Sequence, residues 1–230
     1  MVINIARMTW INNLSLSTAY YNFNFYLLIF TVWLAYAFAY RVSLAHLNPA
    51  ITIVHMCRTD GNFNWIQGIL YILIQPFGFG LGICAAWWFL RSAGSIHIYT
   101  ETATNDDWYA ESVGMEVAAG FIFALVHLLQ TNPVTAISPN KLWQTAVIGM
   151  TYTTTLYWSF DRTGGSNNPA YGLSQTFIDL WDDGQKEAMR YTWIYCICPV
   201  VGALMAWPLY QIIYCKAHET AVSSDAVNKI

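Results

Sequence analysis

The chain has 230 residues, of which 56% are hydrophobic and only 10% are charged. Soluble globular domains carry about 25% charged residues, so this composition indicates one polytopic α-helical membrane domain and no soluble domain. The net charge of −3 excludes a nucleic-acid partner, which requires a basic surface. The five cysteines are odd in number and lie mostly in apolar segments, which argues against a disulfide framework and against a zinc site.

A polar N-terminal segment, residues 1–23, precedes the predicted membrane domain of residues 24–214, and residues 215–230 form a polar tail. Five stretches of the membrane domain have about the 20 apolar residues that cross a bilayer as a helix. These predicted spans are residues 24–43, 63–90, 108–130, 141–160 and 190–214. The absence of acidic residues before Asp60 is a feature of organelle transit peptides. A plasma-membrane and an organelle location, including the mitochondrial inner membrane, therefore both stay open.

Two Asn-Pro-Ala triplets, Asn48-Pro49-Ala50 and Asn168-Pro169-Ala170, follow the first and the fourth predicted span. Pro is favoured in the first turn of a helix, where its missing N–H leaves no bond unmade, and Asn is a favoured N-cap. Each triplet therefore predicts a short helix, over about residues 49–58 and 169–180, that cannot cross a bilayer. The segments predict an all-α, polytopic membrane bundle with five full spans plus two half-helices. Their order is typical of an inverted repeat without its first span.

Further motifs surround the two triplets. The first is the run from His46 to Thr52, and the second is Tyr71 and Gln75 with Gly78 in the following span. The third is Glu116 followed by Phe121. The fourth is Gly149, which leads to Thr163-Gly164 and the second triplet. With these motifs, from about residue 24 to residue 214, the chain resembles the aquaporin family, the major intrinsic proteins. The resemblance is that of a divergent member lacking the first span. The separation of 120 residues between Asn48 and Asn168 suits that family.

The resemblance implies that two half-helices enter from opposite faces and that their N-termini meet at Asn48 and Asn168. Each helix N-terminus carries about half a positive charge, so the pair repels cations and protons, while the Asn amides donate hydrogen bonds to a neutral solute. The resemblance implies further roles for Glu116, which accepts hydrogen bonds from loop backbone, and for His46, which supports the first half-helix loop. A proton relay is the weaker alternative for Glu116, and simple packing is an equal alternative for His46.

The selectivity filter departs from the family pattern. Counting residues without gaps from the two triplets places the four filter positions of the family at Leu28, Leu156, Gly165 and Tyr171. Tyr171 stands where water-selective members place an Arg, so the fixed cation is absent. Arg162, in the same predicted loop, is an alternative source of positive charge. Leu44 also departs mildly, because a Gly is common there.

The first span is the largest departure. Residues 1–22 contain several Asn residues and Arg7, and cannot supply about 20 apolar residues. The glutamate that mirrors Glu116 in the family's first span has no counterpart in the chain. We therefore expect a groove on the bundle, which a helix of another chain could fill.

Two functions stay open. The first is an aquaporin-like channel for water or small neutral, glycerol-like solutes, in the lipid bilayer as a homotetramer. The second is a non-conducting, channel-derived structural subunit of a larger hetero-oligomeric membrane complex, which supplies the missing helix. An enzyme is not expected, because the membrane segments contain no paired carboxylates, no nucleophile with a base and no metal cluster. No cofactor is expected either.

Overall fold

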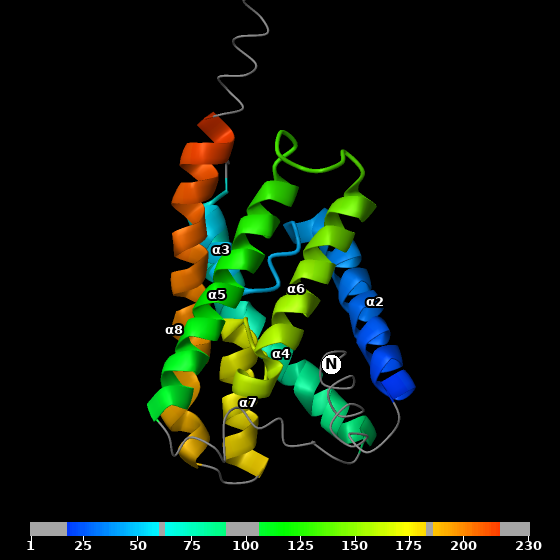
Figure 1. Cartoon of the computed structure of the whole chain (residues 1–230), viewed down its shortest axis with the longest axis vertical. Coiled ribbons are helices and arrows are strands. Elements are labelled where there is room, and N and C mark those ends of the chain that lie inside the picture. Colours follow the sequence, from blue (N-terminus) through cyan, green and yellow to red (C-terminus); the bar gives the residue numbers. More distant parts are fainter. Residues whose placement is uncertain (1–17, 60–62, 91–105, 183–185, 217–230) are drawn as a thin grey trace, which may run out of the picture.

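The structure, a computed structural model, describes residues 18–59, 63–90, 106–182 and 186–216. Within these ranges it contains helices and no strand (Figure 1). The long helices are α2 (Thr18–Ser43), α4 (Trp65–Leu90), α5 (Asp106–Thr131), α6 (Lys141–Thr163) and α8 (Lys186–Pro208). The short helices are α3 (Pro49–Cys57) and α7 (Pro169–Asp182). The predicted all-α bundle of five long helices and two half-helices is confirmed.

Four of the long helices contain stretches that are long and apolar enough to cross a membrane. These stretches are Phe25–Ser43, Trp65–Ala86, Tyr109–Thr131 and Met189–Tyr214. The remaining long helix, α6, is more polar because it is rich in Thr. The α2 helix begins at Thr18 rather than at the predicted residue 24. The predicted absence of a preceding span concerns residues 1–17, which lie outside the described residues.

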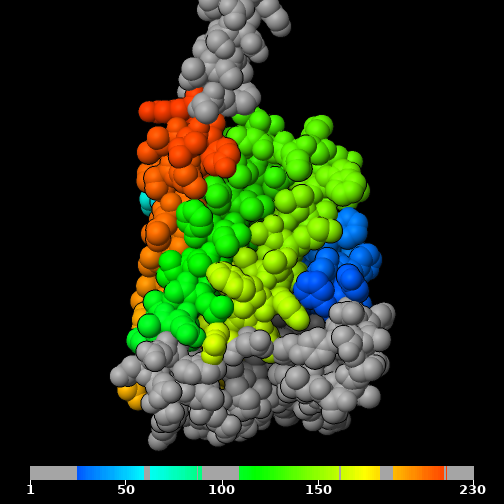
Figure 2. All heavy atoms as spheres, in the orientation of Figure 1, coloured from blue at the N-terminus to red at the C-terminus, as the bar shows by residue number. Residues whose placement is uncertain are grey.

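The two half-helices enter the bundle from opposite ends, and their N-termini meet in its middle (Figure 1). The long helices surround them in pairs: α5 packs along α8, and α2 packs along α6. The α4 helix instead packs on the half-helices α3 and α7. In the space-filling view, α5 and α6 cover most of one face between α8 and α2 (Figure 2). The α2–α6 and α5–α8 pairs therefore enclose the space in which the half-helices meet.

The contact between α5 and α8 is close because glycines line it. A Cβ atom on Gly120 would lie 2.5 Å from the Pro199 carbonyl oxygen, and one on Gly202 would lie 2.7 Å from the Phe121 backbone nitrogen. Small residues allow helix backbones to approach in this way inside membranes. After Pro208 the helix continues as a π-helical segment, η1 (Leu209–Cys215). Pro lacks the N–H that would continue the regular hydrogen-bond ladder, which favours this wider turn.

The main hydrophobic core lies among α2, α3, α5, α6, α8 and η1. It contains both aliphatic and aromatic side chains that are almost completely buried. Its completely buried members are Val54, Ala124, Leu128, Ile148, Ala203, Ala206 and Tyr210. This core fixes the long helices that carry the candidate site.

Candidate functional site: two opposed half-helices

The Asn residues of both triplets cap the half-helices. Asn48 has extended backbone, with φ −153° and ψ 123°, and its Oδ1 accepts a hydrogen bond from the Ala50 N–H at 2.9 Å. The Asn168 Oδ1 accepts from the Ala170 N–H at 3.0 Å. Pro49 and Pro169 occupy the first position of their helices. The local geometry is therefore what Asn-Pro predicts for a helix start.

The same two side chains also join the halves of the molecule. The Asn48 Nδ2 donates to the Asn167 carbonyl oxygen at 2.8 Å, and the Asn168 Nδ2 donates to the Leu47 carbonyl oxygen at 2.8 Å. Both Asn side chains are about 1% exposed. Each half-helix thus holds the loop that precedes the other, and their positive N-terminal dipole ends face each other in the bundle interior.

Unusual backbone conformations lead into both half-helices. Leu44 and Ala45 have φ of 53° and 55°, and Asn167 has φ of 45°. Such left-handed conformations cost about 1–3 kcal/mol each for residues with a Cβ atom, so contacts must hold them in place. In the first loop, the His46 carbonyl oxygen accepts hydrogen bonds from the Asn48 N–H and the Gln75 Nε2.

Glu116 holds the second loop. Its Oε2 accepts from the Asn167 N–H at 2.8 Å, and its Oε1 accepts from the Ser166 N–H at 3.3 Å and the Thr163 hydroxyl at 2.6 Å. The carboxylate is completely buried. A carboxylate inside a membrane bundle is costly unless it is well bonded, and these donors stabilise it. The arrangement ties α5 to the loop between α6 and α7.

The four predicted filter positions lie on α2, α6, α7 and the loop between α6 and α7. Leu28 is half-buried, whereas Leu156 and Tyr171 are 4% and 2% exposed. Gly165 has φ of 63°, and a Cβ there would overlap the Leu156 carbonyl oxygen. The Tyr171 ring lies 5.9 Å, centroid to centroid, from the ring of Phe79 on α4. Their role in selectivity stays a prediction.

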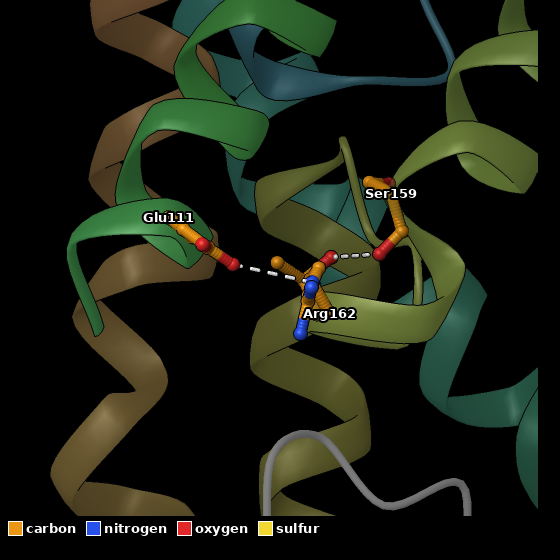
Figure 3. Close-up of polar contacts among 4 residues, drawn as sticks. Glu111, Ser159 and Arg162 are labelled. Carbon is orange, nitrogen blue, oxygen red and sulfur yellow. Dashed lines mark hydrogen bonds and ion pairs between the residues drawn. The ribbon is translucent and has the colours of Figure 1, made fainter. Parts of the chain in front are cut away.

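The structure pairs Arg162 with an acidic residue of α5. Arg162 belongs to the last turn of α6 rather than to the loop, and its Nε lies 3.2 Å from the Glu111 Oε2 on α5 (Figure 3). The two side chains are 36% and 52% exposed. Arg162 therefore forms a partly exposed ion pair with α5.

Three histidines, His46, His55 and His127, form a cluster that is not apparent in the sequence. The His55 Nε2 lies 3.1 Å from the His127 Nδ1, and the His46 ring centroid lies 4.2 Å from that of His55. Within the described residues, neither ring nitrogen of His46 has a hydrogen-bond partner. The described residues also contain no group of three His, Cys, Asp or Glu placed to bind a metal ion. The cluster could not be predicted because 72 residues separate His55 from His127.

Opposed half-helices with buried, cross-bonded N-terminal asparagines inside a membrane bundle define a transmembrane channel protein for water or solutes. The chain belongs to the major intrinsic protein family, because the family model matches residues 4–210. The match begins before the first predicted span.

Individual relatives agree with this membership. The chain is 26% identical over 200 residues to aquaporin TIP2-3 of Arabidopsis thaliana, covering 85% of this chain and 73% of that protein. It is 28% identical over 176 residues to the glycerol uptake facilitator protein-like 6 of Lactiplantibacillus plantarum, covering 75% of each. Its fold is similar to the crystal structure of the aquaglyceroporin from Plasmodium falciparum, with a TM-score of 0.70, 19% identity and 85% coverage of both chains.

Proposed function

We propose that the chain conducts water or small neutral solutes past Asn48 and Asn168. The observation that supports the proposal is the reciprocal bonding of these two side chains at the meeting point of the half-helices. Each amide carries a second N–H that a solute oxygen can use, and the opposed dipoles repel cations. Leu28, Leu156 and Tyr171 would make a filter without a fixed charge, which favours glycerol-like solutes beside water.

Glu116 and His46 act in this proposal as supports of the pore. Glu116 keeps the second loop in place through backbone N–H groups of Ser166 and Asn167. His46 supports the first loop through its carbonyl oxygen, and its ring packs against those of His55 and Phe63. Neither residue transfers a proton in this account.

Asn168→Asp tests the proposal. The carboxylate can still cap Ala170 but cannot donate to Leu47, and it places a negative charge between the dipole ends. We expect the permeability of reconstituted liposomes to water and glycerol to fall by about tenfold, which corresponds to about 1.4 kcal/mol in the barrier. The measurement is stopped-flow light scattering after an osmotic step.

The matched control is Asn140→Asp. Asn140 caps α6 in the same way, accepting from the Leu142 N–H at 2.9 Å, but it is exposed at the end of the bundle. It should leave permeability unchanged. Equal permeability of the Asn168→Asp protein and the wild type would contradict the proposed path.

A structural role in a larger complex is the second candidate, and the exposure of α4 favours it. Only 11% of the apolar stretch of α4 is buried, against 17% for α2, 44% for α5 and 33% for the stretch that runs from α8 into η1. The exposed face is apolar and is formed by Ile66, Leu70, Leu73, Ile74, Phe77 and Leu81. In this alternative, a helix of another chain covers α4 in place of a first span.

The native mass after gentle detergent extraction discriminates between the two candidates. A homotetramer has four times the 26.1 kDa of one chain, plus detergent. We expect this mass for the channel. Migration with a much larger assembly would support the structural role, and crosslinkers placed at Leu73 or Phe77 should then capture the partner helix. Crosslinking to lipid alone would count against it.

A further inference from the structure

The inverted repeat gives each position before Asn48 a counterpart before Asn168. Tyr36 and Leu156 each lie 12 residues before the Asn of their half, and Val32 and Tyr152 each lie 16 residues before it. All four side chains are 3–4% exposed. Residues four apart on a helix lie on the same face. On α2, Val32 and Tyr36 therefore share a face with the predicted filter residue Leu28. On α6, Tyr152 shares a face with the predicted filter residue Leu156.

Two of these four positions carry tyrosines, and a third ring joins them. The ring centroids of Phe123 and Tyr152 are 5.0 Å apart, those of Tyr36 and Tyr152 are 6.1 Å apart, and those of Tyr36 and Phe123 are 6.3 Å apart. We call Tyr36, Phe123 and Tyr152 the aromatic triad. Aromatic rings at these separations are in direct contact, so no water-sized space divides them.

The aromatic triad lies beside the Asn pair. The Tyr152 hydroxyl donates to the Ser166 carbonyl oxygen at 3.4 Å, two residues before Asn168. Its members come from α2, α5 and α6, which are three of the helices that surround the half-helices. Because the repeat is inverted, Tyr36 lies on the opposite side of the Asn pair from its counterpart Leu156, a predicted filter position.

Beyond the aromatic triad the side chains become polar again. His127 follows Phe123 by one turn of α5, and their ring centroids are 5.9 Å apart. His127 in turn contacts His55. The aromatic triad therefore contacts a polar section at the second loop, before Asn168, and another at the histidines. An apolar constriction between polar sections blocks water by excluding it from the narrow part.

We infer that the aromatic triad, and not the four predicted filter positions, is the main permeation barrier of this chain. The inference rests on the proposed function, because it places the barrier on the path past Asn48 and Asn168. A solute crosses only when a ring rotates or moves aside. The triad thus sets both the rate and the largest solute, and truncating one ring widens the path.

We choose the substitutions that test this inference from the residues at the counterpart positions of the repeat. Tyr152→Val and Tyr36→Leu each replace an aromatic residue by the residue at its repeat counterpart. We expect Tyr152→Val to raise the water permeability of phosphatidylcholine liposomes about tenfold, and the double variant to raise it further. Tyr157→Val is the matched control, because Tyr157 also lies on α6 but is 47% exposed. It should behave as the wild type.

Two separate comparisons keep the inference and the proposed function apart. Wild-type liposomes against empty liposomes test conduction by the chain, and the ratio of variant to wild type tests the position of the barrier. A ratio near one for folded Tyr152→Val protein overturns the inference. So does a larger increase from Leu156→Ala than from any triad variant. If the Tyr152→Val protein does not fold, Phe123→Leu replaces it in the same test. Phe123→Leu also removes one ring of the triad, and it changes the side-chain volume less.

Discussion

Glu116→Ala is expected to destabilise the protein by at least about 3 kcal/mol and to abolish permeation. The substitution removes the acceptor of the Ser166 and Asn167 N–H groups and of the Thr163 hydroxyl, all of which are buried. Buried donors without an acceptor are costly, and Asn167 would lose one of the bonds that hold its positive φ. The loop would then no longer present Asn168 to the other half-helix.

The loss is measured by thermal unfolding in detergent and by osmotic shrinkage of liposomes. Glu111→Ala is the matched control on the same helix, because the Glu111–Arg162 pair is partly exposed and such pairs contribute about 0–1 kcal/mol. Glu116→Gln should be intermediate, since its amide NH₂ would face a backbone N–H where an oxygen now accepts. A Glu116→Ala protein that unfolds at the wild-type temperature would refute this account of the loop.

Gly202→Ala is expected to cost several kcal/mol, because the new Cβ atom would overlap backbone. It would overlap the Val117 carbonyl oxygen and lie 2.7 Å from the Phe121 nitrogen. Neither atom is the end of a flexible side chain, so α5 and α8 must separate along their whole contact. Close-packed interiors tolerate such overpacking poorly, with typical losses of about 1–3 kcal/mol and more where backbone must move.

Gly114→Ala is the control for this prediction. Gly114 lies on α5 as well, and among the described residues nothing lies within 4 Å of its added Cβ. Its replacement should be neutral or stabilise the helix by up to about 1 kcal/mol, since Ala is the better helix former. The two proteins are compared by thermal unfolding and by elution volume in detergent. Equal stability of both would show that the α5–α8 contact is looser than the structure indicates.

The capped half-helices could be predicted because capping is local: Asn followed by Pro defines a helix start within a few residues. The ends of the long helices were less predictable. The sequence predicts Arg162 in a loop, yet α6 continues to Thr163, and Gly164 with φ of 71° ends it. That stop depends on a left-handed conformation that Gly permits but does not require.

Features made by distant residues could not be predicted from the sequence. The histidine cluster and the aromatic triad each bring together side chains from separate helices. Single aromatic residues in a membrane chain are ordinary, and Trp and Tyr are common at the membrane interfaces. Only the packing of α2, α5 and α6 brings Tyr36, Phe123 and Tyr152 together. Counting 12 and 16 residues back from both triplets would have indicated Tyr36 and Tyr152 as lumen positions, but not their contact.

The reciprocal bonds of the two asparagines also constrain the order in which the protein folds and assembles in the membrane. The Nδ2 of Asn48 donates to a residue 119 positions later in the chain, and that of Asn168 to one 121 positions earlier. During synthesis, α3 therefore remains without this partner until α6 and α7 have left the ribosome and entered the bilayer. Contacts of such long range form slowly, and until they form the Asn48 amide lacks the Asn167 carbonyl oxygen as its acceptor. Maturation of the α3 loop thus depends on completion of the C-terminal half.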